Sequence, residues 1–305
     1  MVELSTIETE QKNERTKNID SLSTLEVLLL INDEDKKVAF AVEKELEHIA
    51  EAVEIIYEKI VRGGRLIYSG CGTSGRLGVL DSAECPPTFG TDPELVQALI
   101  AGGITAIVKA VEGAEDNQEL GVKDLQDINF TNRDVLVGIA ASGRTPYVIG
   151  AVNYAKSIGA KTISVTCSPN SELNSIVDVA ITPQPGPEVI TGSTRLKSGT
   201  AQKMVLNMLS TSVMIKLGKV YGNLMVDVKA TNEKLIERTV SIVRGTTRVS
   251  DAKARETLAL CGYSAKTAIV MIECNMNTEE AEKALMDANG HIARVISRKS
   301  NESNF

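Results

Sequence analysis

The sequence predicts an α/β protein: a doubly wound, three-layer α-β-α domain around a central five-stranded parallel sheet, followed by a small helical C-terminal subdomain. Three observations lead to this prediction. Short apolar runs, hydrophobic on both faces, alternate with helical stretches, as is typical of parallel strands covered on both sides. Glycine-rich turns follow two of these runs and open helices. After about Asn232 the strand pattern stops, and short helical runs replace it.

Ahead of the first strand, apolar residues recur at spacings of three and four, which predicts one amphipathic helix that ends at Gly63-Gly64. These residues are Val38, Val42, Leu46, Ile49, Val53, Ile56 and Ile60. The expected strands are Leu66–Ser69, Leu95–Ala101, Val135–Ala140, Thr162–Cys167 and Val179–Thr182. Helical stretches such as Ile104–Val111 and Pro146–Ser157 lie between strands and complete the βαβ rhythm.

The C-terminal part of the sequence is predicted to be helical. Residues 200–217 are apolar on most helical faces, so this helix must be buried in the domain or against a partner subunit. Beyond it, Ser250-Asp251 and residues 277–280 are suited to start helices. We therefore expect two domains: residues 1–234, with the sheet and an N-terminal helical segment, and residues 235–305 as a small helical subdomain.

Bulk composition excludes several functional classes. The chain has 305 residues, of which 43% are hydrophobic and 24% charged, as in ordinary globular proteins. A net charge of -7 and a pI of about 5.2 argue against nucleic-acid binding. No apolar run reaches the length of about 18 residues that a membrane span needs. The polar N-terminus and five cysteines without C-x-x-C spacing fit a cytoplasmic protein.

The turn after the first strand carries the clearest ligand-binding signal. Its small residues Gly72, Thr73 and Ser74 would let an anion approach the free N–H groups of a helix N-terminus. Together with Gly70 and Gly75 the turn also fits a dinucleotide pattern, but no acid ends the next strand to hold a ribose. The two hydroxyl groups favour a phosphate monoester. The sequence thus favours a small phosphorylated ligand over NAD.

A second turn repeats this chemistry after the third strand. Ser142, Gly143 and Thr145 precede Pro146, which suits the first turn of a helix. In a parallel sheet, ligands bind beyond the carboxyl ends of the strands, where the winding reverses. We therefore expect both turns to hold one phosphate.

A third turn leads into the apolar helix that begins near residue 200. Its Ser193, Arg195 and Lys197 could hold sugar oxygens or a phosphate. Helix capping and solvated charge explain the same residues equally well, and the sequence leaves both interpretations open.

Carboxylates are the candidate catalytic groups, because neither His48 nor His291 is placed as an attractive base. Glu84 precedes the pair Pro86-Pro87, which is expected to end its helix. At the negative end of the helix dipole a carboxyl group favours its protonated form, which suits a proton donor. The second acidic cluster, residues 112–116, would also be favourable in the first turn of a helix, and its charge pattern singles out no residue.

The turns at residues 70–75 and 141–145 resemble the phosphosugar-binding turns of the sugar isomerase (SIS) fold. Blocks along nearly the whole chain also resemble the N-acetylmuramic acid 6-phosphate etherases of bacteria. They are residues 23–26, 31–35, 80–88, 110–116, 192–203 and 224–228, in the family's order. The only difference noted within these turns and blocks is Cys71, in a position that is often alanine.

The resemblance implies that the chain cleaves the ether between D-lactate and C3 of the sugar, giving N-acetylglucosamine 6-phosphate and D-lactate. It places the two catalytic glutamates at Glu84 and Glu115. Our hypothesis is that Glu115 takes the C2 proton and later activates water, while Glu84 protonates the departing oxygen. Neither a metal nor an organic cofactor is expected.

Helix geometry raises a difficulty for this hypothesis. An unbroken helix would place Glu84 roughly 13 Å along its axis from Gly75, which a six-carbon sugar barely spans. Either the helix breaks near Gly78, or Glu84 serves a neighbouring subunit. The second case predicts a homodimer with sites at its interface.

Two other functions remain open from the sequence. A non-catalytic phosphosugar sensor would keep the hydroxyl-rich turns but would need neither glutamate. An aldose–ketose isomerase would share deprotonation at C2 but would need no acid for a leaving group.

Overall fold

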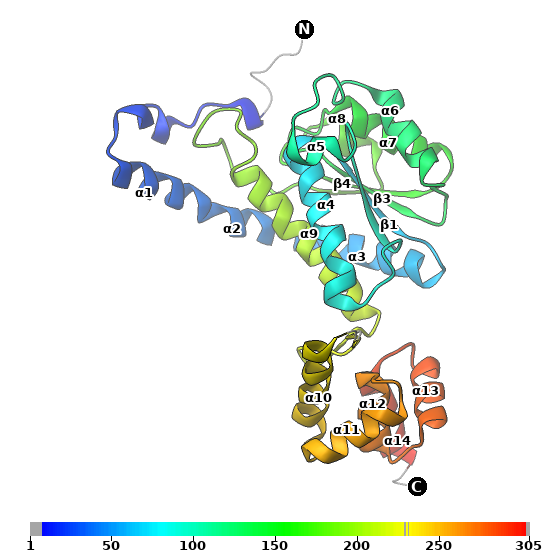
Figure 1. Cartoon of the computed structure of the whole chain (residues 1–305). Helices are drawn as coiled ribbons and strands as arrows, with labels where there is room; N and C mark the ends of the chain where they lie inside the picture. Colours follow the sequence, from blue (N-terminus) through cyan, green and yellow to red (C-terminus); the bar gives the residue numbers. More distant parts are fainter. Residues whose placement is uncertain (1–7, 229, 231, 303–305) are drawn as a thin grey trace. The chain divides into compact units, whose positions relative to one another are not determined.

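The structure is a computed structural model (Figure 1), and it describes residues 8–228, 230 and 232–302. It divides into two compact units. The larger unit comprises Met1–Glu84 and Pro93–Ser210, and the smaller unit comprises Cys85–Asp92 and Thr211–Phe305. The domain boundary expected after residue 234 stays a prediction.

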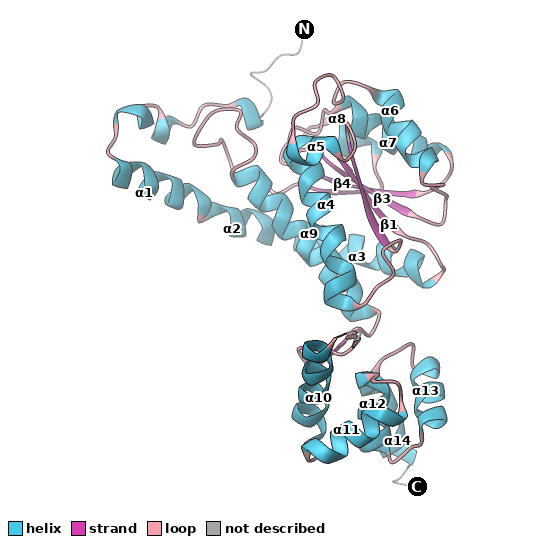
Figure 2. Cartoon of the chain, in the orientation of Figure 1, coloured by secondary structure: helices cyan, strands magenta, loops and turns pink. Residues whose placement is uncertain are grey.

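The larger unit is built on the expected five-stranded parallel sheet, in the order β2-β1-β3-β4-β5 (Figure 2). The strands are β1 Leu66–Gly70, β2 Val96–Ile100, β3 Val135–Ile139, β4 Lys161–Val165 and β5 Val179–Ile181. Gly70 pairs with Ile139, so β1 and β3 end side by side. The winding reverses between these two strands, and the turns that follow them therefore share one edge of the sheet.

Helices cover both faces of this sheet, which confirms the predicted α/β fold. The helices that lie in or begin in the larger unit are α1 Thr24–Asp35, α2 Lys37–Glu43, α3 Leu46–Val61, α4 Gly72–Phe89, α5 Thr105–Val108, α6 Gln118–Asp127, α7 Pro146–Ser157, α8 Glu172–Ile176 and α9 Lys197–Lys216. Short 3-10 helices precede them at Glu8–Glu10, Glu14–Thr16 and Ile19–Ser21. On one face, Tyr68 contacts α4 at Gly78; on the other, Gly138 contacts α7 at Val148.

The prediction of a single helix before β1 is wrong, because α2 and α3 are separate helices. The helix is interrupted at Lys44 and Glu45, where the Glu45 N–H donates to the Val42 carbonyl. The Glu45 carboxylate accepts the Thr182 N–H at 2.9 Å and contacts the His48 ring at 2.9 Å. The break keeps the apolar spacing of three and four, so the hydrophobic pattern does not reveal it.

The prediction that α4 ends at its proline pair is also wrong. The helix continues through Pro86 and Pro87 to Phe89. Proline's fixed φ fits a helix, and the missing N–H groups leave two carbonyls one turn earlier without their helical partner. Gly90 ends the helix instead: it has φ +62°, and its N–H donates to the Pro86 carbonyl at 2.9 Å. Glu84 therefore does not lie at a helix C-terminus, and the dipole argument for it fails.

The smaller unit is mainly helical, as expected. Its helices are α10 Glu233–Thr247, α11 Asp251–Leu260, α12 Ala265–Cys274, α13 Thr278–Asp287 and α14 Ile292–Glu302. Ser250 caps α11, and Asn277 forms a capping box with α13, so both predicted helix starts are confirmed. Val243, Leu258 and Ile269 are fully buried in its core.

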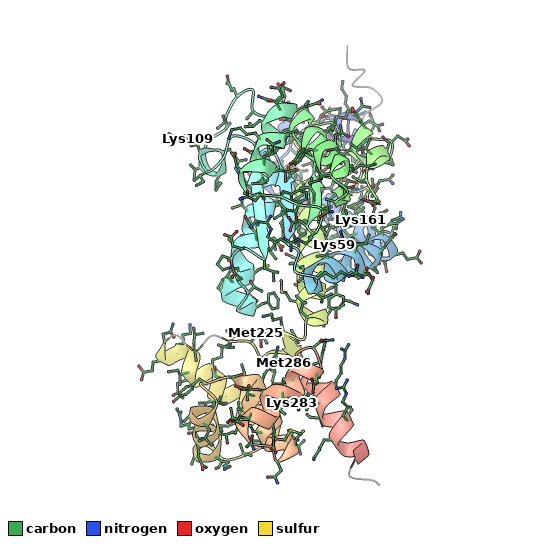
Figure 3. All side chains as sticks on the ribbon, turned by 90° about the vertical axis from the view of Figure 1, so that its right-hand side faces the viewer. Lys59, Lys109, Lys161, Met225, Lys283 and Met286 are labelled. Atoms are coloured by element: carbon green, nitrogen blue, oxygen red, sulfur yellow. The ribbon has the colours of Figure 1, made fainter. Side chains whose placement is uncertain are left out.

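A two-stranded hairpin was not expected in this unit. Its strands, β6 Val220–Tyr221 and β7 Leu224–Met225, flank Gly222-Asn223, a dipeptide suited to a two-residue turn. Figure 3 labels Met225 of this hairpin and Met286 of α13, which is largely exposed. Within the described residues, no single helix is long and apolar enough to cross a membrane; α11 and α12, bent by 113° at their junction, meet that test only when taken together.

Candidate active site

Two glycine-containing turns lie at the edge where β1 and β3 end. Gly72 opens α4 with φ +53°, and Gly143 precedes α7 with φ +63°. A Cβ atom on Gly143 would lie 2.2 Å from the Ser171 hydroxyl oxygen, and one on Gly70 would lie 2.7 Å from the Gly75 nitrogen. Glycine is therefore required for this backbone path. Both turns lead into helix N-termini, whose free N–H groups can bind an anion.

Glu115 joins these two turns. Its carboxylate accepts the Thr145 hydroxyl at 3.2 Å, and its carbonyl accepts the Tyr147 N–H at 3.0 Å. Burial and the adjacent Glu115 charge raise the pKa of the Cys71 thiol to about 11. The Glu115 side chain remains exposed, so it can contact a substrate held by both turns. The structure thus brings Glu115 together with the predicted phosphate ligands of the first and second turns.

The third turn approaches the first through α9. A Cβ atom on Gly199 would lie 3.3 Å from the Thr73 methyl carbon, and the Ser74 hydroxyl donates to the Gln202 side chain at 2.9 Å. Ser193 is half-buried and Arg195 is exposed at this turn. These two residues are therefore accessible in the third turn, which lies beside the first turn.

The N-terminus of α9 already holds a carboxylate of the protein. Buried Glu188 accepts the N–H groups of Lys197 and Ser198, each at 2.9 Å. The Lys197 ammonium, one of the candidate ligand-binding groups of the third turn, donates to Glu34 at 2.7 Å and to the Pro185 carbonyl at 2.9 Å. Both side chains of the Lys197–Glu34 pair are only 1% exposed. In this geometry Lys197 orders the third turn.

Glu34 forms ion pairs with three cations, Arg15, Lys37 and Lys197. Burial acts to raise the pKa of Glu34, but hydrogen bonds from Lys197 and Lys37 outweigh it and bring the pKa down to about 2. Arg15 adds a further contact at 2.7 Å. Glu34 is therefore ionised throughout the physiological pH range.

Glu84 lies far from the first turn. The α4 helix is continuous through Gly78, which excludes the break considered from the sequence. Glu84 follows Gly72 by twelve residues, or roughly 18 Å along the helix axis. It is exposed and lines a separate pocket between α4 and α9. The structure does not bring Glu84 together with Glu115 within one chain.

Comparison with known proteins decides the family. A family model described as "Glucokinase regulatory protein N-terminal SIS domain" matches residues 48–156, and one described as "SIS domain" matches residues 108–212. N-acetylmuramic acid 6-phosphate etherases of Aliivibrio fischeri and Clostridium beijerinckii are 55% and 58% identical, over 97% and 98% of this chain and 99% and 98% of theirs. The chain belongs to the N-acetylmuramic acid 6-phosphate etherase family. This confirms the resemblance noted in the sequence and does not favour the sensor interpretation.

The etherase family assignment rests on these relatives rather than on solved structures. One structural neighbour, a phosphoheptose isomerase from Francisella tularensis, is 16% identical with a TM-score of 0.48, over 63% of this chain and 98% of its own. Within the described part of the chain, no group of three or more His, Cys, Asp and Glu side chains is arranged to hold a metal ion.

Sequence reasoning missed several residues that shape this etherase-family site. Gln202, Glu188 and Glu34 hold the turns in place, and Asp81 and Lys203 line the Glu84 pocket. All of them except Glu188 carried a weak signal, since they lie in blocks that resemble the family. Glu34 offered none toward Lys197, because 163 positions separate the two in the sequence.

Proposed function

We propose that this chain is an N-acetylmuramic acid 6-phosphate etherase that cleaves the C3 ether and releases D-lactate and N-acetylglucosamine 6-phosphate. The observation that carries the proposal is the position of Glu115 between two phosphate-type turns, in a chain of this family. A base placed beside a bound phosphosugar is what the reaction requires.

The chemistry needs an acid and a base. An ether is not an acetal, so protonation of its oxygen alone leaves no stabilised cation. In the open-chain sugar, C2–H lies beside the C1 aldehyde, and the lactyl oxygen lies one carbon further away. Removal of the C2 proton gives an enolate, which forms the C2–C3 double bond as the C3–O bond breaks. Water then adds to C3, and C2 takes a proton back.

We assign Glu115 as the base at C2 and Glu84 as the acid that protonates the departing lactyl oxygen. Glu115 then loses the C2 proton to solvent, and Glu84 regains one from solvent. The ionised Glu115 takes a proton from the incoming water as the hydroxyl adds to C3, and it returns that proton to C2. Each proton transfer of this kind typically contributes about 10²–10⁴-fold to the rate. The Thr145 hydrogen bond keeps the Glu115 carboxylate between the two turns, which supports this assignment.

The phosphate is assigned to the first two turns. The proposed ligands are the backbone N–H groups near Gly72 and Gly143 and the hydroxyls of Thr73 and Ser142. The hydroxyls of Ser74 and Thr145 donate to Gln202 and Glu115, so these two residues are proposed to contribute their backbone N–H groups. Ser193 and Arg195 complete the set. The buried Lys197 contributes by ordering the third turn. Binding energy from the phosphate, remote from the reacting carbons, orients them for reaction.

We further propose a homodimer in which Glu84 serves the partner's site. The unbroken α4 helix, which separates Glu84 from the first turn by roughly 18 Å, supports this arrangement. We also propose that this enzyme is a cytoplasmic lyase that needs no metal and that it acts in the recycling of cell-wall amino sugars.

The test is release of D-lactate from N-acetylmuramic acid 6-phosphate in the presence of EDTA, with N-acetylglucosamine 6-phosphate followed as co-product. Equal amounts of both products support a metal-independent etherase. Binding of the phosphosugar without lactate release would overturn the proposal and favour a sensor. Activity that EDTA abolishes and added metal restores would overturn the metal-independent part alone.

A further inference from the structure

A pocket of about 300 Å³ lies between α4 and α9 and contains Glu84. Its lining is Leu77, Leu80, Asp81, Glu84, Lys203, Leu206 and Asn207. The two helices meet at the Ser74–Gln202 bond near one end and at the Asp81–Ser210 bond near the other. Glu84 therefore shares its pocket with one cation, one amide and an apolar wall of leucines.

The acid Asp81 is already engaged within the protein. Its carboxylate accepts the Tyr68 hydroxyl at 2.8 Å and the Ser210 hydroxyl at 3.0 Å. Burial raises its pKa, against the hydrogen bonds from Tyr68 and Ser210. Asp81 therefore contributes little as a binding group for an external ligand.

Lys203 and Asn207, in contrast, face the pocket from the exposed side of α9. The Lys203 ammonium donates to the Asn207 side-chain oxygen at 2.7 Å. An ammonium group has three N–H donors, so two remain beyond this bond. Because the Asn207 oxygen accepts this bond, its NH₂ group is left to donate. The pair thus offers adjacent donors suited to a carboxylate.

The proposed reaction supplies such a carboxylate at this place. In the lactyl group, the ether oxygen, the carboxylate and a methyl group are all attached to one carbon. An acid that reaches the ether oxygen is therefore within a few bond lengths of the carboxylate. We propose that Lys203 and Asn207 bind the lactyl carboxylate while Glu84 protonates the ether oxygen, with the methyl group against Leu80 and Leu206. This inference rests on the proposed function and on Glu84 as its acid.

Such binding makes Lys203 a specificity-determining residue. It selects ethers that carry a carboxylate over neutral ethers of the same sugar phosphate. Glu84 lies roughly 18 Å along α4 from Gly72 of the first turn. In the proposed dimer, Lys203 and Glu84 of one subunit therefore act together on a sugar whose phosphate the other subunit holds.

The test compares two substrates: N-acetylmuramic acid 6-phosphate and its analogue in which the lactyl carboxylate is a neutral amide. Lys203→Met is expected to lower kcat/KM for the acid substrate by about 10- to 100-fold, as for loss of a charged hydrogen-bond partner. It should lower kcat/KM for the amide much less, because the amide carbonyl accepts a hydrogen bond but carries no charge. Lys203→Arg should keep most of the activity on the acid, and Asn207→Leu should reduce it less than Lys203→Met does.

The matched control is Lys123→Met, which removes an exposed charge on α6, away from the pocket, and should change neither substrate. Equal losses on acid and amide would overturn the inference, as would no loss on the acid. If the amide is not turned over, its inhibition constant against the acid substrate gives the same comparison. A wild-type enzyme that releases no lactate would instead overturn the proposed function, and this inference with it.

Discussion

Replacing Glu34 with glutamine is predicted to destabilise the larger unit by about 3 kcal/mol at neutral pH. The fall in the Glu34 pKa from 4.5 to about 2 corresponds to about 3 kcal/mol, at about 1.4 kcal/mol for each pH unit. Removing one partner of a buried ion pair independently costs about 3–5 kcal/mol, because the remaining charge stays buried. Here that charge is the Lys197 ammonium, which is 1% exposed.

The effect has a defined pH dependence. The folded-state pKa of Glu34 is lowered, so its stabilisation is fully present above pH 4.5 and is lost as the pH falls toward 2. The difference between wild type and Glu34→Gln should therefore narrow across that range. Urea unfolding followed by circular dichroism at several pH values measures it.

Two variants sharpen this experiment. Asp33→Asn removes a neighbouring carboxylate that is 48% exposed and bonded to Lys36, and it should change the unfolding midpoint little. Adding Lys197→Met to Glu34→Gln should recover part of the lost stability, since no unpaired charge remains. An unfolding midpoint for Glu34→Gln equal to that of wild type at pH 7 would refute the reasoning.

Three further predictions concern the site. In D₂O, Glu115→Gln should lose hydrogen exchange at the sugar C2, and Glu84→Gln should retain some; the reverse pattern, read by NMR, would exchange their roles. Gly143→Ala should lower the melting temperature more than Gly159→Ala, since both have a positive φ but only Gly143 adds a 2.2 Å clash; equal losses would show that the clash is relieved. Cys71 should react slowly with iodoacetamide at pH 8, because burial and the Glu115 charge raise the pKa of its thiol to about 11. The Glu115→Gln variant should react faster. Fast labelling of Cys71 in the wild type, measured by mass spectrometry, would contradict this prediction.

The sheet could be predicted from sequence because its strands are buried on both faces and read as continuous apolar runs. Breaks and stops in helices were harder. The interruption at Glu45 preserves the apolar spacing of the helix. Pro86 and Pro87 lie close to the end of α4, but it is Gly90 that ends this helix. Such features depend on single hydrogen bonds, which a hydrophobic pattern does not record.

The site was only partly visible in the sequence. Small residues and hydroxyls predict the two phosphate-binding turns, since their chemistry is local, and the binding itself stays a prediction. Charge pattern did not separate Glu115 from Glu112; the Thr145 hydrogen bond does, and it depends on the fold. The burial of Lys197 was invisible for the same reason, because its partner Glu34 lies on a distant helix.

Subunit complementation tests the central claim most directly. Glu84→Gln and Glu115→Gln are each prepared separately, then unfolded, mixed in equal amounts and refolded together, with each variant refolded alone as control. If Glu84 serves the partner's site, the hybrid dimer has one intact site, and random pairing restores lactate release to about a quarter of the wild-type rate. Mixed samples no more active than the separate variants, with mixed dimers demonstrated by mass spectrometry, would contradict the shared site.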